Sequence, residues 1–150
     1  MKKSLMFLAA AAAVSLPIMA SAQFAKPEDA IKYRKAAFTI MAAHFGRVGA
    51  MVSGKAPWDA KVAGENIATA VSVHKLAFAG FVPGSDKGET KAKAEVWSDA
   101  AGFEKKRAAM SEAMGKLGEA GKGGDQGAIK TAFGAVGQSC KACHDDYRAK

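Results

Sequence analysis

Apolar residues recur every three to four positions along the first long segment of the chain. After Pro27, the series 31, 34, 38, 41, 45, 48 and 52 repeats every seven residues and is apolar except at Arg34. A repeat of this kind is typical of an amphipathic helix that packs against other helices. Because proline suits the first turn of a helix, the spacing predicts a helix from Pro27 to about Val52.

Three further segments show the same rhythm, the first of them weakly. Their apolar positions are Trp58, Val62, Ile67, Val73 and Leu76; then Val96, Ala100, Phe103, Met110, Met114 and Leu117; then Ile129, Phe133, Val136, Cys140, Cys143 and Tyr147. Turn-forming residues separate the segments at 53–57, 83–88 and 121–124, and the alternation expected of strands is not seen. The pattern predicts an all-α fold, an antiparallel up-down-up-down four-helix bundle.

Arg34 is the one charged residue in the apolar series of the first helix. A guanidinium at such a position has two explanations. Its long stem can lie along the core while the charge reaches solvent, or the charge can meet a buried anion. The pattern alone leaves both open.

The first 22 residues have the features of a secretory signal peptide. Lys2 and Lys3 precede an apolar run over residues 5–14, and Ala20-Ser21-Ala22 supplies the small residues before a cleavage site. A membrane anchor is the alternative, but the run is shorter than the ~20 residues of a spanning helix and Pro17 interrupts it. We therefore expect an exported, periplasmic protein without membrane insertion, whose mature domain covers residues 23–150.

The charge of the chain is strongly positive. The full sequence of 150 residues carries a net charge of +8, and loss of the two lysines in residues 1–22 lowers it to +6. A basic protein can dock on acidic partners. Basic residues interleaved with aromatic ones are not clustered anywhere in the sequence, so nucleic acid is not an expected partner.

The two cysteines of the chain both belong to the motif Cys140-Lys141-Ala142-Cys143-His144. This is the attachment motif of a c-type haem. On a helix, residues three and four apart share a face, so both thiols can add to the haem vinyl groups while the histidine reaches the iron. The motif predicts one covalent haem c bound through Cys140 and Cys143, with His144 as axial iron ligand.

Three other interpretations of the motif were considered. A thioredoxin-like dithiol would need a βαβ context, which the pattern lacks. A structural zinc ion would need two more ligands, which His44 and His74 would have to supply from other helices. A chance pair of buried cysteines leaves the adjacent histidine unexplained. We interpret His44 and His74 as half-exposed surface histidines.

The sequence resembles the cytochrome c′ family, the helical-bundle class of c-type cytochromes. The resemblance covers residues 24–150 and rests on FAKPEDAIKYRKAAF at 24–38, EVWSDAAGF at 95–103 and AFGAVGQSCKACHDDYR at 132–148. It implies that Arg34 lies near a haem propionate. Lys35, where the family often has Gln, is also placed on the propionate side, and Arg148 is placed beside the proximal face of the haem.

The resemblance also bears on the sixth ligand of the iron. Relatives with six-coordinate haem have a methionine four residues after the arginine of the first helix, and this chain has Phe38 there. A phenyl ring cannot ligate iron, so we expect five-coordinate haem with an aromatic distal face. Met41 is the nearest other candidate, but three residues further along the helix we interpret it as core.

These expectations favour a periplasmic haem protein that binds NO and CO, is redox-active and is not an enzyme. NO scavenging, NO tolerance and electron transfer are the roles that the resemblance implies. The alternatives are a dedicated electron-transfer cytochrome with a defined redox partner, and a thiol oxidoreductase that uses Cys140 and Cys143. Homodimers formed through the first two helices are common in the family, and a basic monomer is the other possibility.

Overall fold

The computed structural model of the chain describes residues 23–150. The predicted signal peptide lies outside these residues. Four long helices account for most of the described chain: α1 (Pro27–Val52), α2 (Ala60–Ala79), α4 (Ala100–Gly123) and α5 (Gln126–Tyr147), with a single-turn helix α3 (Glu95–Ser98) before α4. Within residues 23–150 the β structure is limited to one isolated bridge between Ala92 and Arg148.

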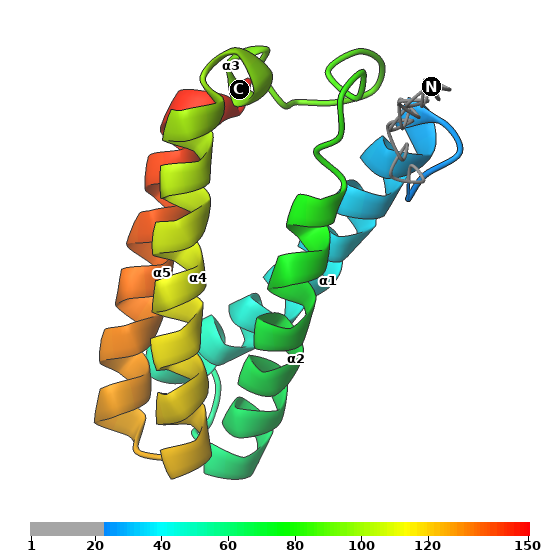
Figure 1. Cartoon of the computed structure of the whole chain (residues 1–150). Helices are drawn as coiled ribbons and strands as arrows, with labels where there is room; N and C mark the ends of the chain where they lie inside the picture. The colour runs from blue at the N-terminus through cyan, green and yellow to red at the C-terminus, as the bar shows by residue number, and fades with distance from the viewer. Residues whose placement is uncertain (1–22) are drawn as a thin grey trace, which may run out of the picture.

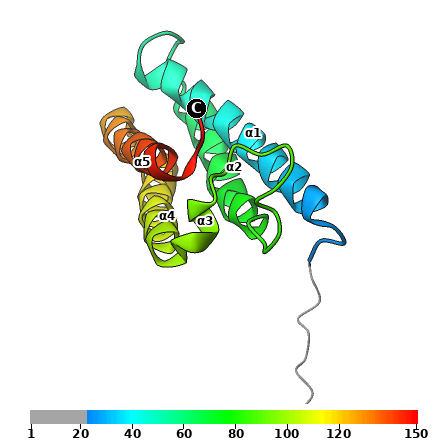
Figure 2. The ribbon, with the colours of Figure 1, turned by 90° about the horizontal axis from the view of Figure 1, so that it is seen from above.

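The helices run alternately down and up, and the predicted antiparallel four-helix bundle is confirmed (Figure 1). α1 packs mainly on α2, and α4 mainly on α5, while α2 also contacts α4. The two pairs meet where α1 and α4 end and diverge toward the end that carries α3 and the C-terminus, as both views show (Figures 1 and 2). The segment between α2 and α3 crosses from one pair to the other at the divergent end.

Most of the apolar positions predicted to face the core are buried. Along α1, Ile31, Met41, Val48 and Val52 are all less than a tenth exposed, and Leu117 and Ile129 are fully buried. In α2 the predicted face is only partly right, because Ile67 is buried but Val62 and Leu76 are 41% and 48% exposed. Besides Ile67, the buried face of α2 consists of small and polar residues: Ala63, Asn66, Ala70, His74 and Ala77.

Two predicted boundaries differ from the structure. The third segment is not one helix, because the Asp99 backbone leaves the helical conformation and its carboxylate caps α4 by accepting a hydrogen bond from Gly102 N at 3.1 Å. The turn expected at 121–124 is confined to Gly124, which has φ +71°. Gly121 remains helical, and its lack of a side chain serves a close approach: a Cβ there would lie 2.9 Å from Cγ2 of Ile67 on α2.

Candidate haem site

The motif residues lie on the last turns of α5. Asp125 caps the start of this helix by accepting a hydrogen bond from Ala128 N at 2.7 Å, and the helix continues through Cys140, Cys143 and His144 to Tyr147. Both cysteine side chains are half-buried. Both thiols and the imidazole line the same cavity, as expected for positions three and four apart on a helix.

The cavity occupies the divergent end of the bundle and has a volume of about 930 Å³. This lies within the range of sites that take cofactor-sized molecules. Its walls come from all four long helices and from the segment between α2 and α3. Most of the wall is apolar, formed by Phe38, Met41, Phe45, Phe78, Phe81, Val96, Phe103, Met110, Met114, Val136 and Tyr147. A large, flat, apolar group that reacts with two thiols and one imidazole fits this lining.

Burial sets the ionisation of the three motif residues. It raises the pKa of the Cys140 and Cys143 thiols, which disfavours the thiolate that a dithiol oxidoreductase needs. Burial lowers the pKa of His144, and the positive charge of Arg148 lowers it further. A lowered pKa favours the neutral imidazole, which has a lone pair for a metal.

Neither histidine outside the motif lies on the cavity wall. His44 is half-buried, as expected, with Nδ1 2.8 Å from Oδ1 of Asn66. His74 was expected at the surface but is only 2% exposed. Its Nδ1 lies 2.5 Å from the carbonyl oxygen of Val71. The zinc interpretation required both histidines to reach the cysteines, and their positions contradict it.

One wall of the cavity is formed by an aromatic cluster. The Phe38 ring meets Phe78 edge-on with centroids 5.8 Å apart and Phe81 with centroids 6.2 Å apart. Phe103 continues the cluster, 5.0 Å from Phe81 and 5.3 Å from Tyr147. Edge-to-face pairs of this kind add stability beyond their burial. Met41 is 8% exposed and belongs to the core, although it also borders the cavity.

Arg34 and Lys35 both line the cavity but are bound differently. The Arg34 side chain is 2% exposed and donates hydrogen bonds to four neutral oxygens, two of them on Ser85. The first sequence explanation is wrong, since the guanidinium does not reach solvent, and its acceptors within the described chain are neutral. Lys35 is exposed and donates to the carbonyl oxygen of Glu89 at 3.2 Å. A propionate contact of either residue stays a prediction.

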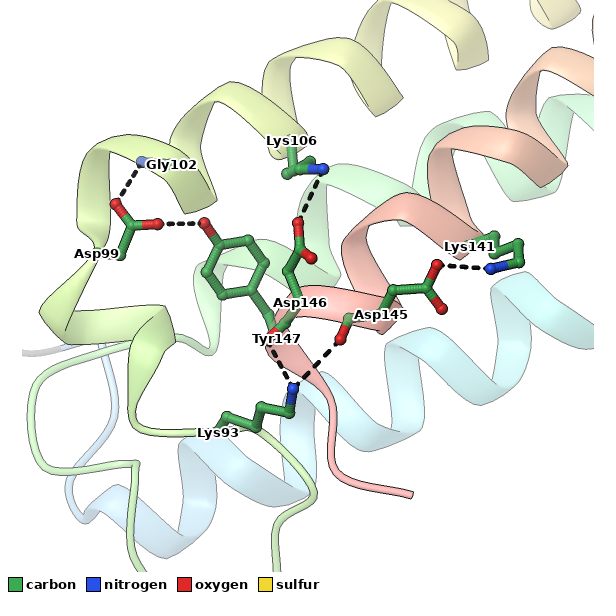
Figure 3. A network of polar contacts seen from close by, with 8 residues as sticks. All are labelled: Lys93, Asp99, Gly102, Lys106, Lys141, Asp145, Asp146 and Tyr147. Atoms are coloured by element: carbon green, nitrogen blue, oxygen red, sulfur yellow. Dashed lines mark hydrogen bonds and ion pairs between the residues drawn. The ribbon is translucent and has the colours of Figure 1, made fainter.

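The end of α5 is fastened by a polar network (Figure 3). Tyr147 donates a hydrogen bond to Oδ2 of Asp99 at 2.6 Å, which raises the pKa of Tyr147 to about 12. Lys93 donates to the carbonyl oxygens of Asp145 and Asp146. Two ion pairs join this region, Lys106 with Asp146 at 2.9 Å and Lys141 with Asp145 at 2.6 Å. The contacts of Tyr147 with Asp99 and of Asp146 with Lys106 hold the end of α5 against α4, and Lys93 ties it to the segment before α3.

Comparison with known proteins identifies a family with a matching motif. Residues 29–148 match the sequence profile of the cytochrome c′ family. The cytochrome c′ of Rubrivivax gelatinosus is 55% identical over 129 residues, which cover 85% of this chain and 100% of that protein. The chain belongs to the cytochrome c′ family. The cofactor of this family is a covalently attached haem c, and the CxxCH motif at residues 140–144 is where the chain carries the matching residues.

Solved structures of cytochromes c′ share the fold. The R. gelatinosus protein superposes with a TM-score of 0.83, covering 85% of this chain and 100% of its own. A nitric oxide complex of a variant of the Alcaligenes xylosoxidans cytochrome c′ has a TM-score of 0.80 at 48% identity, covering 85% of this chain and 99% of its own. A carbon monoxide complex of another variant of that protein superposes equally well, with the same identity and with 85% and 100% coverage.

Several site residues were missed from the sequence. Phe78 and Phe81 come after Leu76, the last apolar position predicted for the second helix. Their three-residue spacing was the signal that could have placed them on one face. Thr90 and Ser85, which bind Arg34, lie in a segment without periodicity. The Asp99–Tyr147 contact joins residues 48 apart, and the local pattern gives no sign of it.

Proposed function

We propose that the chain is a periplasmic, five-coordinate haem c protein that binds NO and CO and is redox-active without being an enzyme. Cys140 and Cys143 would form the thioether bonds and His144 the iron bond. When bound, haem supplies a redox-active iron with one open axial position. The observation that carries the proposal is Phe38, which borders the cavity where six-coordinate relatives have a methionine.

The cavity lining supports selection of weakly polar diatomic ligands. On the α1 side it is lined by Phe38, Met41, Ala42 and Phe45, and the polar residues there are Arg34, Lys35 and Thr39. Bound dioxygen gains from a hydrogen-bond donor, whereas NO and CO depend on one less. A mainly apolar, aromatic wall therefore favours NO and CO over dioxygen. The nitric oxide and carbon monoxide complexes of the A. xylosoxidans relative support the same ligands here.

The attachment of haem is tested on the purified protein. A haem stain that survives denaturing electrophoresis is expected for the wild type and is expected to be lost in the Cys140→Ala/Cys143→Ala variant. Survival also excludes a thiol oxidoreductase, because thioether bonds consume both thiols. Free thiols and no bound haem in the wild type would contradict the proposal.

Phe38 is expected to act as a steric gate on the distal face. We predict that Phe38→Ala accelerates CO association with the ferrous protein several-fold, measured by rapid mixing, because the ligand no longer has to displace the ring. Phe24→Ala is the matched control, since Phe24 packs on Tyr33 outside the cavity. Equal CO association rates in the wild type and Phe38→Ala would refute the gate.

Coordination of the iron separates the two functions that the family allows. Optical and EPR spectra of both oxidation states are expected to show high-spin haem that binds CO. A low-spin spectrum with a methionine-to-iron band would favour a dedicated electron-transfer cytochrome. Phe38→Met supplies the reference spectrum, because it restores the sulfur that six-coordinate relatives have at this position.

Export and dimerisation complete the proposal. None of the helices in residues 23–150 is long and apolar enough to cross a membrane. The large exposed apolar residues are Ile40 on α1 and Val62 and Leu76 on α2, which supports a homodimer through these helices. Sedimentation should show a dimer that Leu76→Lys weakens. A mature mass beginning at Gln23 in the periplasmic fraction would match the predicted cleavage.

A further inference from the structure

The segment between α2 and α3 closes one side of the haem cavity. We call residues 80–92 the strap; its residues 88–92 line the cavity. At its far end, the strap is joined to the end of α5 by backbone contacts. Ala149 N donates to the Lys91 carbonyl at 2.8 Å, and Ala92 forms the β-bridge with Arg148. The residue after the strap, Lys93, donates its N–H to the Tyr147 carbonyl at 3.0 Å.

Two cations of α1 bind the strap. Lys35 is exposed and donates only to the Glu89 carbonyl at 3.2 Å, whereas the contacts of Arg34 are buried or partly buried. Nη1 donates to the Gly80 carbonyl at 2.8 Å and to Oγ of Ser85 at 2.6 Å. Nη2 donates to the Ser85 carbonyl and to Oγ1 of Thr90, both at 2.7 Å. Thr90 Oγ1 also accepts from Ala92 N at 3.0 Å. The contacts therefore continue from α1 through the strap to the residue that pairs with Arg148.

The arrangement is specific to arginine. All four terminal N–H groups of the guanidinium donate to strap oxygens. The Cζ atom of Arg34 lies 4.7 Å from the ring centroid of Phe81 and 5.7 Å from that of Trp97. A lysine ammonium has three donors and no flat face, so it cannot reproduce this set. Gly80 leaves no space for another group, since a Cβ there would lie 2.7 Å from Cβ of Arg34.

We propose that Arg34 is a positioning residue that fastens the strap over the mouth of the haem cavity and so limits the entry of solvent and small ligands. Burying a charge is costly unless it is fully hydrogen-bonded, and here the bonds go to the backbone and hydroxyls of one loop. Because Nη1 and Nη2 have no donor left over, a haem propionate has only Nε available unless it displaces a strap oxygen. Only the statement about ligand entry rests on the proposed function.

Hydrogen–deuterium exchange of the holoprotein tests the fastening. In Arg34→Lys, we expect amides of residues 81–92 to exchange about tenfold faster or more, because at least one charged hydrogen bond is lost. Amides in the middle of α5 should be unchanged. Arg107→Lys is the matched control, since Arg107 is bound by its own helix neighbour Glu104 and is not part of the cavity wall. Unchanged strap exchange in Arg34→Lys would overturn the proposal.

A milder variant keeps the test valid if Arg34→Lys folds poorly. Thr90→Val removes one acceptor with little change of shape, and we expect a smaller acceleration of exchange that is confined to the strap. CO association should be several-fold faster in both variants. Faster exchange without faster CO association would overturn the role in ligand entry only. A protein that binds no CO at all would refute the proposed function, while the exchange result would still decide the fastening.

Discussion

The two ends of the bundle are packed in different ways. Where the helix pairs meet, helices approach closely: a Cβ at Gly64 would lie 3.1 Å from the carbonyl oxygen of Gly121, and Leu117 and Ile129 are fully buried. At the divergent end the same helices surround a cavity of about 930 Å³, and a buried arginine, a strap and an aromatic cluster form its wall. One end is filled by side chains alone, whereas the other is shaped for a cofactor.

This difference separates stability from function. Contacts at the closed end hold four helices together without touching the haem cavity, so changes there should lower stability and leave the haem spectrum unchanged. Contacts at the open end shape ligand access, and a change such as Phe38→Ala should alter rates more than stability. Substitutions at the closed end test this division.

The largest loss of stability is expected from Leu117→Ala. Leu117 is fully buried in α4 at the closed end, and removing its methyl groups leaves a cavity that costs about 2–5 kcal/mol. Thermal or denaturant unfolding of the holoprotein measures the loss. Lys116→Ala is the control from the neighbouring exposed position, where only a solvent-screened ion pair with Glu112 is removed, and a much smaller loss is expected. Equal effects of the two variants would contradict the division.

A smaller loss is expected where α2 and α4 approach closely. Gly121→Ala places a methyl group against Ile67, with contacts of 2.9, 3.1 and 3.2 Å. Overpacking of this kind costs about 1–3 kcal/mol. Gly115 lies in the same helix with open space around it, so Gly115→Ala should instead stabilise by about 0.5–1 kcal/mol through helix propensity. The two free energies of unfolding, measured side by side, should therefore have opposite signs.

The sequence was informative wherever a physical signal is local. The seven-residue repeat predicted the buried face of α1, and the CxxCH spacing predicted which residues share the cavity. It was only partly right for α2, because apart from Ile67 the buried face is lined by small residues such as Ala63 and Ala70 rather than by large apolar ones. The helix break at Asp99 was missed because the apolar rhythm continues across it.

The contacts that shape the open end are not local. Arg34 reaches residues 46 to 56 positions away along the chain, and the strap that it binds has no periodicity. Such contacts are decided by tertiary packing. The sequence could therefore mark Arg34 as unusual but could not say what the guanidinium binds.

The smallest effect is expected at His74 and concerns pH rather than packing. His74 is buried and its Nε2 has no hydrogen-bond partner in the described part of the chain. Burial lowers its pKa in the folded protein, and the charge of Lys75 lowers it further although the Val71 carbonyl opposes both. The unfolded chain, with a histidine pKa of about 6.5, then binds a proton that the folded chain resists. Stability is full above this pH and is lost as the pH falls below it.

His74→Leu should therefore reduce the loss of stability between pH 7.5 and pH 5.5, because the side chain that must charge on unfolding is gone. Melting temperatures of the holoprotein at the two pH values measure the difference. Val136→Ala is the control, since it changes a buried side chain that does not titrate, and it should keep the pH dependence of the wild type. Contributions of His144 are common to all three proteins and cancel in the comparison. If His74→Leu retains the full pH dependence, the loss arises from other groups and the buried imidazole is merely accommodated by the fold.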